Sequence, residues 1–120
     1  MANFQNLIGY KLASSAVTAS YVTIYTVPSA STIPAVPATR TFVKDINVCN
    51  TTAGALGVYV HIVPSGGTAD TSNAIYYNTS VAANNIIHWN GVQIMNAGDT
   101  IQVKGSATGL AIIISGAQGT

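Results

Sequence analysis

Hydrophobic and polar residues alternate along most of the chain, and no stretch shows the spacing of an amphipathic helix. The alternation is clearest over residues 56–63, where the even positions are aliphatic and Tyr59 and His61 fall on the opposite face. Alternation and β-branched or aromatic content predict strands over residues 8–12, 21–27, 41–49, 56–63, 74–81, 86–89, 92–95, 100–104 and 110–115.

Turn-forming residues separate these segments at the short, regular spacing that is typical of all-β sandwiches and barrels. Asn90-Gly91 predicts a tight turn between two short strands. Asp99 follows Gly98 in another turn, where we expect its carboxylate to accept backbone N–H bonds. We therefore predict that residues 7–120 form a single antiparallel β-sandwich of about eight strands, with jelly-roll or immunoglobulin-like strand order.

One irregularity is visible inside a predicted strand. Lys44 shares its parity with Ile46, so a strictly regular strand would direct a lysine into the core. A β-bulge or an edge position near Val43 resolves this conflict.

Two segments lie outside the strand pattern. Residues 1–6 contain Phe4 without any pairing pattern and are expected to form an N-terminal arm. Residues 28–39 contain three prolines and no charge, and they predict an extended, polyproline-like insertion. This insertion is either a surface loop or an arm that lies along a neighbouring subunit, with Ile33 and Val36 as its apolar contacts.

Charge is scarce. The chain has 120 residues, of which 6% are charged, and it contains no glutamate. All seven charged residues are Lys11, Arg40, Lys44, Asp45, Asp70, Asp99 and Lys104. Four cations are too few to follow a phosphate backbone, so we expect no nucleic-acid partner. A neutral surface gives little repulsion between copies and favours association with other subunits.

The single cysteine, Cys49, excludes a disulfide within the chain and is expected to be a small buried apolar residue. The first residues show no pattern of a signal peptide, and no apolar run is long enough to span a bilayer. We expect a protein made in a cytoplasm, with no membrane partner.

Candidate chemistry is sparse as well. His61 and His88 have no metal-binding spacing, although Cys49 could join them in a three-ligand site if the fold brought all three together. Asp70 lies in a Gly- and Thr-rich loop and is expected to be solvated. No nucleophile elbow or phosphate loop is present. We predict no enzyme activity and no cofactor.

Adjacent apolar residues in predicted strands are more informative, because one of each pair must point away from the core. Such pairs occur at residues 76–77, 86–87 and 112–113. A covering subunit would explain outward-facing aliphatic side chains at Ile87 and Ile113. A sugar bound at Trp89, with His88, Asn90 and Gln93 beside it, is the alternative covering, and we favour the subunit. The predicted interface residues are Phe4, Ile33, Val36, Tyr76, Ile87, Trp89 and Ile113.

Several turn-containing segments, in order along nearly the whole chain, resemble small β-sandwich virion proteins of tailed bacteriophages. These segments lie at residues 7–9, 24–28, 46–52, 62–67, 81–85 and 96–103. The resemblance implies a capsid decoration, or cement, protein on the outer shell of the virion. Proteins of that kind are commonly homotrimers that clamp neighbouring major capsid subunits. Residues 28–39 depart from the family, which generally has a short turn there.

The resemblance leaves a related alternative open. The chain could instead be a tail, neck or fibre accessory module that binds a glycan or a host surface. Neither form has a catalytic motif to carry over, in agreement with the sparse chemistry of the residues.

Overall fold

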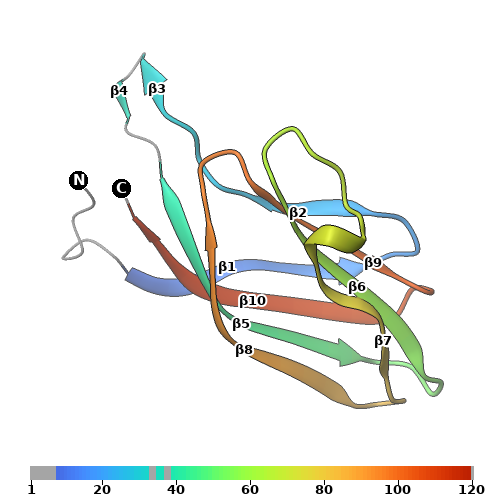
Figure 1. The fold of residues 1–120 in the computed structure, drawn as a ribbon. Helices are drawn as coiled ribbons and strands as arrows, with labels where there is room; N and C mark the ends of the chain where they lie inside the picture. Colours follow the sequence, from blue (N-terminus) through green and yellow to red (C-terminus); the bar gives the residue numbers. More distant parts are fainter. Residues whose placement is uncertain (1–7, 33–34, 37–38, 120) are drawn as a thin grey trace.

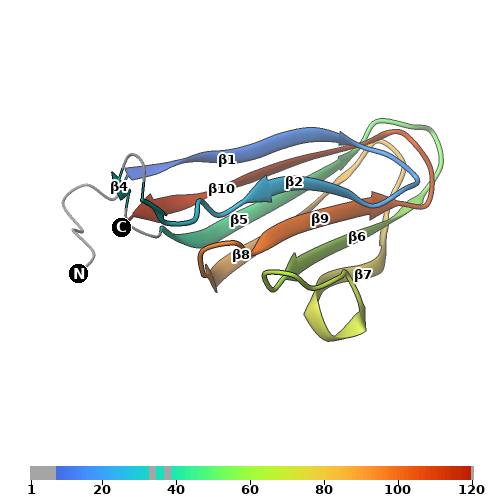
Figure 2. The same ribbon diagram turned by 90° about the horizontal axis from the view of Figure 1, so that it is seen from above.

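The computed structural model describes residues 8–32, 35–36 and 39–119 of the chain. They form an all-β sandwich of two antiparallel four-stranded sheets, which Figures 1 and 2 show as two layers. The first sheet has the strand order β1-β10-β5-β8, and the second has the order β2-β9-β6-β7. The strands are β1 (Ile8–Val17), β2 (Val22–Thr26), β5 (Arg40–Asn50), β6 (Leu56–Val63), β7 (Ala74–Val81), β8 (Ile86–Met95), β9 (Thr100–Gly105) and β10 (Leu110–Gly119).

The pairing of the strands is nested. β1 pairs with β10, β2 with β9, β5 with β8, and β6 with β7. Two further pairings, β10 with β5 and β9 with β6, close each group of four into a sheet. A long antiparallel ribbon wrapped in this way is a jelly roll. The structure thus confirms the predicted sandwich and decides between the two strand orders that the sequence left open.

The core lies between the two sheets and is almost entirely aliphatic. Fully buried side chains include Ile46 and Val48 of β5, Val58 and Val60 of β6, and Ile112 of β10. Burying a side chain of this size contributes roughly 1.5–3 kcal/mol, so the inward parity of each strand is the main source of stability.

β8 differs from the prediction. Two short strands joined by a tight turn at Asn90-Gly91 were expected, but β8 is one strand that pairs with β5 from Cys49↔Ile86 to Thr41↔Met95, with a register shift after Asn90. The turn prediction was wrong because Asn-Gly is a local signal, and pairing with β5 overrides it. Gly91 has a packing role instead, since a Cβ atom there would lie 3.0 Å from the ring of Trp89.

The predicted β-bulge is present. Lys44 has no partner in either ladder of β5, and both ladders shift register between Val43 and Asp45. The extra residue lets Val43 and Ile46 both face the core while Lys44 remains exposed.

The proline-rich insertion folds back on itself. β3 (Ser31–Thr32) and β4 (Ala35–Val36) pair antiparallel, and a 3.3 Å bond from the N–H of Thr39 to the carbonyl of Pro28 closes the base. The described residues are extended, as expected, but they are not polyproline-like, because the backbone groups of the two short strands pair with each other. The small ribbon projects beyond the sandwich at the end where β10 finishes (Figures 1 and 2).

Polar side chains hold the loops. Asp99 accepts hydrogen bonds from the backbone N–H groups of Asn96 (2.9 Å) and Ser65 (3.0 Å), as predicted. Asn50 is fully buried, and its amide donates to the carbonyls of Gly54 and Val81. No helix in the described part of the chain has the length and apolarity needed to cross a membrane.

Candidate functional site

The outer face of the first sheet, called face A here, is dominated by exposed aliphatic side chains. β8 alternates cleanly, so every second residue from Ile86 to Ile94 points away from the core. Exposure is 54% for Ile86, 53% for Val92 and 59% for Ile94, and it is 47% for Ile113 on neighbouring β10. Face A therefore offers apolar surface that another molecule could cover.

The structure shows which member of each adjacent pair faces outward. Ile113 is exposed, as predicted. Ile87, Trp89 and Tyr76 instead pack against the core cluster, and their neighbours are more exposed. The prediction chose the wrong face for these three residues, because alternation alone does not set the parity of a strand that is apolar on both sides. The alternative covering, a sugar bound on Trp89, is not supported, since Trp89 packs against the core.

The remaining predicted interface residues are not described in full. Phe4 and Ile33 lie outside the described residues. Val36 is part of β4, and only its backbone pairing with Ser31 is described.

A carboxylate–imidazole pair lies in the middle of face A. His88 Nε2 is 2.9 Å from Asp45 Oδ2, and the two side chains are 47% and 38% exposed. Because solvent screens a pair this exposed, it stabilises the face only weakly.

The outer face of the second sheet, called face B here, carries an aromatic cluster: Tyr21, Tyr59, His61, Tyr77 and Lys104. The ring of Tyr59 meets the ring of Tyr77 edge-to-face, with centroids 5.1 Å apart. Tyr21 meets His61 in the same way at 5.3 Å. The ammonium of Lys104 sits 4.6 Å from the ring centroid of Tyr59 and 5.0 Å from that of Tyr21. Face B is thus aromatic and cationic where face A is aliphatic.

His61 anchors this cluster, and it is fully buried although it belongs to an outward-facing position. Its Nδ1 lies 2.8 Å from Oδ1 of Asn73, and its Nε2 lies 3.0 Å from the hydroxyl of Tyr21. Oδ1 of Asn73 also accepts a bond from the N–H of Asp70, and its amide donates to Thr68. Because Oδ1 of Asn73 can only accept, Nδ1 of His61 donates this bond, and in the tautomer with its single proton there, Nε2 accepts from the hydroxyl of Tyr21.

Two pKa shifts follow from the local structure of this region. Burial raises the pKa of Tyr21, with smaller contributions from Tyr77 and Tyr59. Hydrogen bonds from the side chain and backbone of Ser72 lower the pKa of Asp70, which caps the short 3₁₀ helix η2 (Thr71–Asn73). Asp70 is thus exposed, as predicted, and it also has the structural role of a helix cap.

Sequence reasoning found only part of the cluster. Alternation correctly placed Tyr59 and His61 on an outer face. It could not associate them with Tyr21, Tyr77 and Lys104, because these residues meet only through the register of β2, β9, β6 and β7.

The three residues considered for a metal site do not come together. Cys49 and His88 lie in outward-facing rows of the first sheet, paired with Ile86 and Asn47, whereas His61 belongs to face B. Within the described residues, no group of three His, Cys, Asp or Glu side chains is placed to hold a metal ion.

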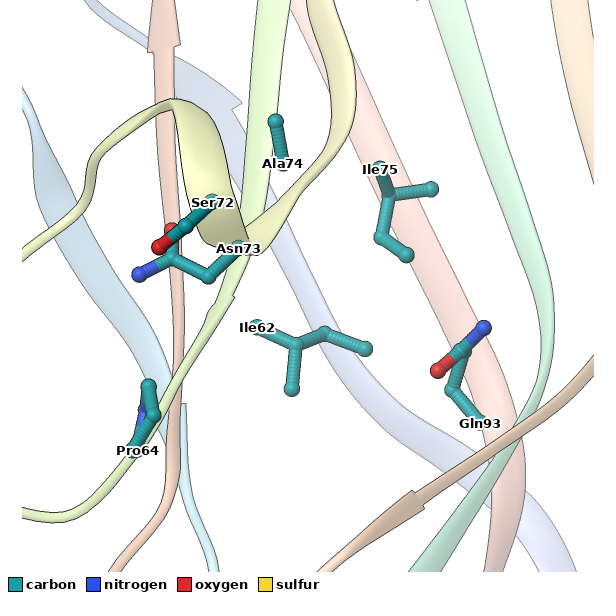
Figure 3. Close-up of a pocket in the computed structure, with 7 residues that line it drawn as sticks. All are labelled: Ile62, Pro64, Ser72, Asn73, Ala74, Ile75 and Gln93. Carbon is teal, nitrogen blue, oxygen red and sulfur yellow. The ribbon is translucent and has the colours of Figure 1, made fainter.

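A pocket of about 380 Å³ is lined by residues in or next to β6, η2, β7 and β8 (Figure 3). Ile62 and Ile75 form its apolar part, and Gln93 of β8 lines the opposite side. The remaining lining residues are Pro64, Ser72, Asn73 and Ala74. None of these side chains is ionisable, so the pocket offers shape and hydrogen bonds without acid–base chemistry.

No protein-family model matches the chain, and no curated protein matches its sequence. Among solved structures, a chain in the structure of infectious bursal disease virus Gx strain is similar, with a TM-score of 0.51 and 15% identity over 95% of this chain and 32% of that one. A chain from the crystal structure of the T13 particle of the same virus gives a TM-score of 0.46 at 12% identity, covering 94% of this chain and 30% of that one. A chain from its VP2 subviral particle gives 0.44 at 13%, covering 96% and 32%. This chain spans about a third of the length of those viral chains. At such identity, the first of these likenesses shows a shared sandwich fold.

Proposed function

We propose that this chain is a non-enzymatic structural protein of a virus particle, and specifically a capsid decoration protein that stabilises the head of a tailed bacteriophage. Its partners would be the major capsid protein and further copies of itself in a homotrimer, and its place would be the capsid surface. The observation that carries the proposal is face A, where Ile86, Val92, Ile94 and Ile113 are each about half exposed.

Face A suits a subunit contact for a physical reason. Because each of these side chains is already about half buried, covering the rest of one contributes on the order of 1 kcal/mol before the costs of association, and few charges oppose the contact. The shell symmetry of a capsid would repeat that gain many times. The jelly-roll fold, which recurs in viral capsid domains, and its likeness to a chain of a virus structure add support.

Sedimentation of the purified chain tests the role of face A. We expect an oligomer that dissociates when Ile94→Asp and Ile113→Asp together place two carboxylates on the face. Tyr77→Asp adds a charge to face B and is the matched control, which should leave the oligomer intact. A wild-type chain that sediments as a monomer and does not bind capsids would contradict the proposal.

The β3–β4 ribbon is expected to strengthen attachment. Removing residues 29–38 should weaken attachment without unfolding the sandwich, because the deletion leaves Val27 and Thr39, which are buried at the base. Attachment that is unchanged by the deletion would exclude this role for the ribbon.

Location is tested on particles from cells that express the chain, using antibodies against it and electron microscopy. Labelling distributed over the head supports the decoration role. Labelling confined to the tail, neck or fibres would support the alternative accessory module, and unlabelled particles would contradict both.

A further inference from the structure

We propose that face B carries a binding site for acidic saccharides, in which Tyr77 is the stacking platform and Lys104 pairs with a sugar carboxylate. The inference concerns the second sheet only and does not depend on the capsid role of face A.

The first observation is the exposed ring of Tyr77. Its side chain is 55% exposed, yet the ring is held edge-to-face by Tyr59 at 5.1 Å and by His61 at 6.2 Å. An aromatic ring that is more than half exposed and held by its neighbours offers apolar surface to a ligand, and its hydroxyl can also form hydrogen bonds. This combination matches a sugar ring, which has an apolar C–H face and a polar rim.

The second observation is that the cluster is already ordered. Buried His61 bonds both Tyr21 and Asn73, and Asn73 is fixed in turn by the backbone of Asp70 and Thr68. A ligand would therefore not need to order these side chains when it binds, which lowers the free-energy cost of association.

The third observation is the charge of Lys104. Its ammonium rests on the rings of Tyr59 and Tyr21. Among the described residues, the one salt bridge joins His88 to Asp45 on the opposite face, so the positive charge of Lys104 has no carboxylate partner there. A cation held in an aromatic cluster complements a ligand carboxylate and disfavours a cationic ligand.

The charges of the chain also disfavour a second copy as the occupant. Its three aspartates are engaged: Asp45 with His88, Asp70 with Ser72, and Asp99 with the N–H groups of Ser65 and Asn96. To pair with Lys104, an aspartate of a second copy would therefore have to share its carboxylate with the partners that it already holds.

The test uses two probes with the same sugar backbone, trigalacturonic acid and its uncharged methyl ester, titrated into isotopically labelled protein and followed by NMR. We expect both to shift resonances of the face B cluster, with the acid binding about three- to fivefold more tightly than the ester, the range of an exposed ion pair. High salt should reduce that ratio.

Two lysine variants separate a specific charge from general attraction. Lys104→Gln should bring the acid-to-ester ratio to one, whereas Lys44→Gln, which removes an exposed cation of the first sheet, should leave it unchanged. Tyr77→Ala should weaken the binding of both probes by about tenfold, and thermal melting of each variant checks that the fold is retained.

Several outcomes would overturn the proposal. They are an unchanged ratio in Lys104→Gln, resonance shifts confined to β5 and β8, and no saturable binding at millimolar probe. Tighter binding of an acidic peptide than of the acidic saccharide would assign the site to a protein partner. A change of oligomeric state in Tyr77→Ala would assign it to a second copy.

Discussion

The two outer faces of the sandwich arise from the same alternation of residues, but they hold their side chains differently. On face A, Ile94 and Ile113 are exposed, and the central polar contact is the open His88–Asp45 pair. On face B, the side chains contact one another, and a buried histidine joins them to the loop before β7. Covering the apolar side chains of face A with another molecule would add stability, whereas the contacts within face B already stabilise the single chain.

The largest expected effect comes from the two histidines, one on each face. His61→Ala removes a buried ring and leaves the Tyr21 hydroxyl and Asn73 Oδ1 without that partner, so we expect a loss of about 3 kcal/mol in the free energy of unfolding. His88→Ala breaks an exposed ion pair and should cost less than about 1 kcal/mol. Urea denaturation measures the free energy of unfolding of both variants. Equal losses of this free energy would contradict the expected difference between the two faces.

The next effect concerns the hydroxyl of Tyr21. Tyr21→Phe should cost about 1 kcal/mol at neutral pH, because Nε2 of His61 loses its hydrogen bond. Since burial raises the pKa of Tyr21 above its usual range, the folded state holds this proton more tightly than the unfolded state does. The contribution of Tyr21 to stability is therefore fully present below the pKa of the unfolded tyrosine and is lost as the pH rises through the folded pKa.

Thermal melting across the alkaline range measures this pH dependence. The melting temperature of the wild type should fall more steeply with rising pH than that of Tyr21→Phe. Burial also raises the pKa of Tyr76, so Tyr76 should leave a residual slope in the variant. Identical slopes in the two proteins would show that Tyr21 does not produce the alkaline loss.

The smallest expected effect compares two side chains of similar exposure. Ile113→Thr on face A should change the free energy of unfolding of the single chain by no more than about 0.5 kcal/mol. Tyr77→Thr on face B should cost about 1 kcal/mol, because it removes the ring contacts with Tyr59 and His61. Denaturation at low protein concentration measures the free energy of unfolding of each variant. A larger loss for Ile113→Thr than for Tyr77→Thr would contradict the expected difference between the two faces.

Much of the fold could be predicted because its signals are local. The bounds of β6 and β7 agree with the predicted residues 56–63 and 74–81. The bulge at Lys44 was predicted because unbroken alternation would turn a charged residue toward the core. The hydrogen bonds that Asp99 accepts from backbone N–H groups were predicted from the turn residues around it. The tight turn at Asn90-Gly91 failed because a local preference was weaker than a ladder of hydrogen bonds to β5.

The candidate site was harder to predict. Tyr21 and His61 are 40 positions apart, and their contact depends on β2 and β6 each pairing with β9 in one register. Nothing in the residue pattern near Tyr77 or Lys104 indicates that these two residues lie beside Tyr21 and His61.

The sequence by itself determined that this chain is a neutral, all-β sandwich, because alternation and turn residues act over a few positions and charge is a simple count. Only the tertiary structure decided the nested strand order, the inward side of Trp89 and Ile87, and the meeting of five side chains on face B. Each of these depends on pairing between strands far apart in the chain, such as β1 with β10, and the register of such pairs is fixed by the packing of the whole core.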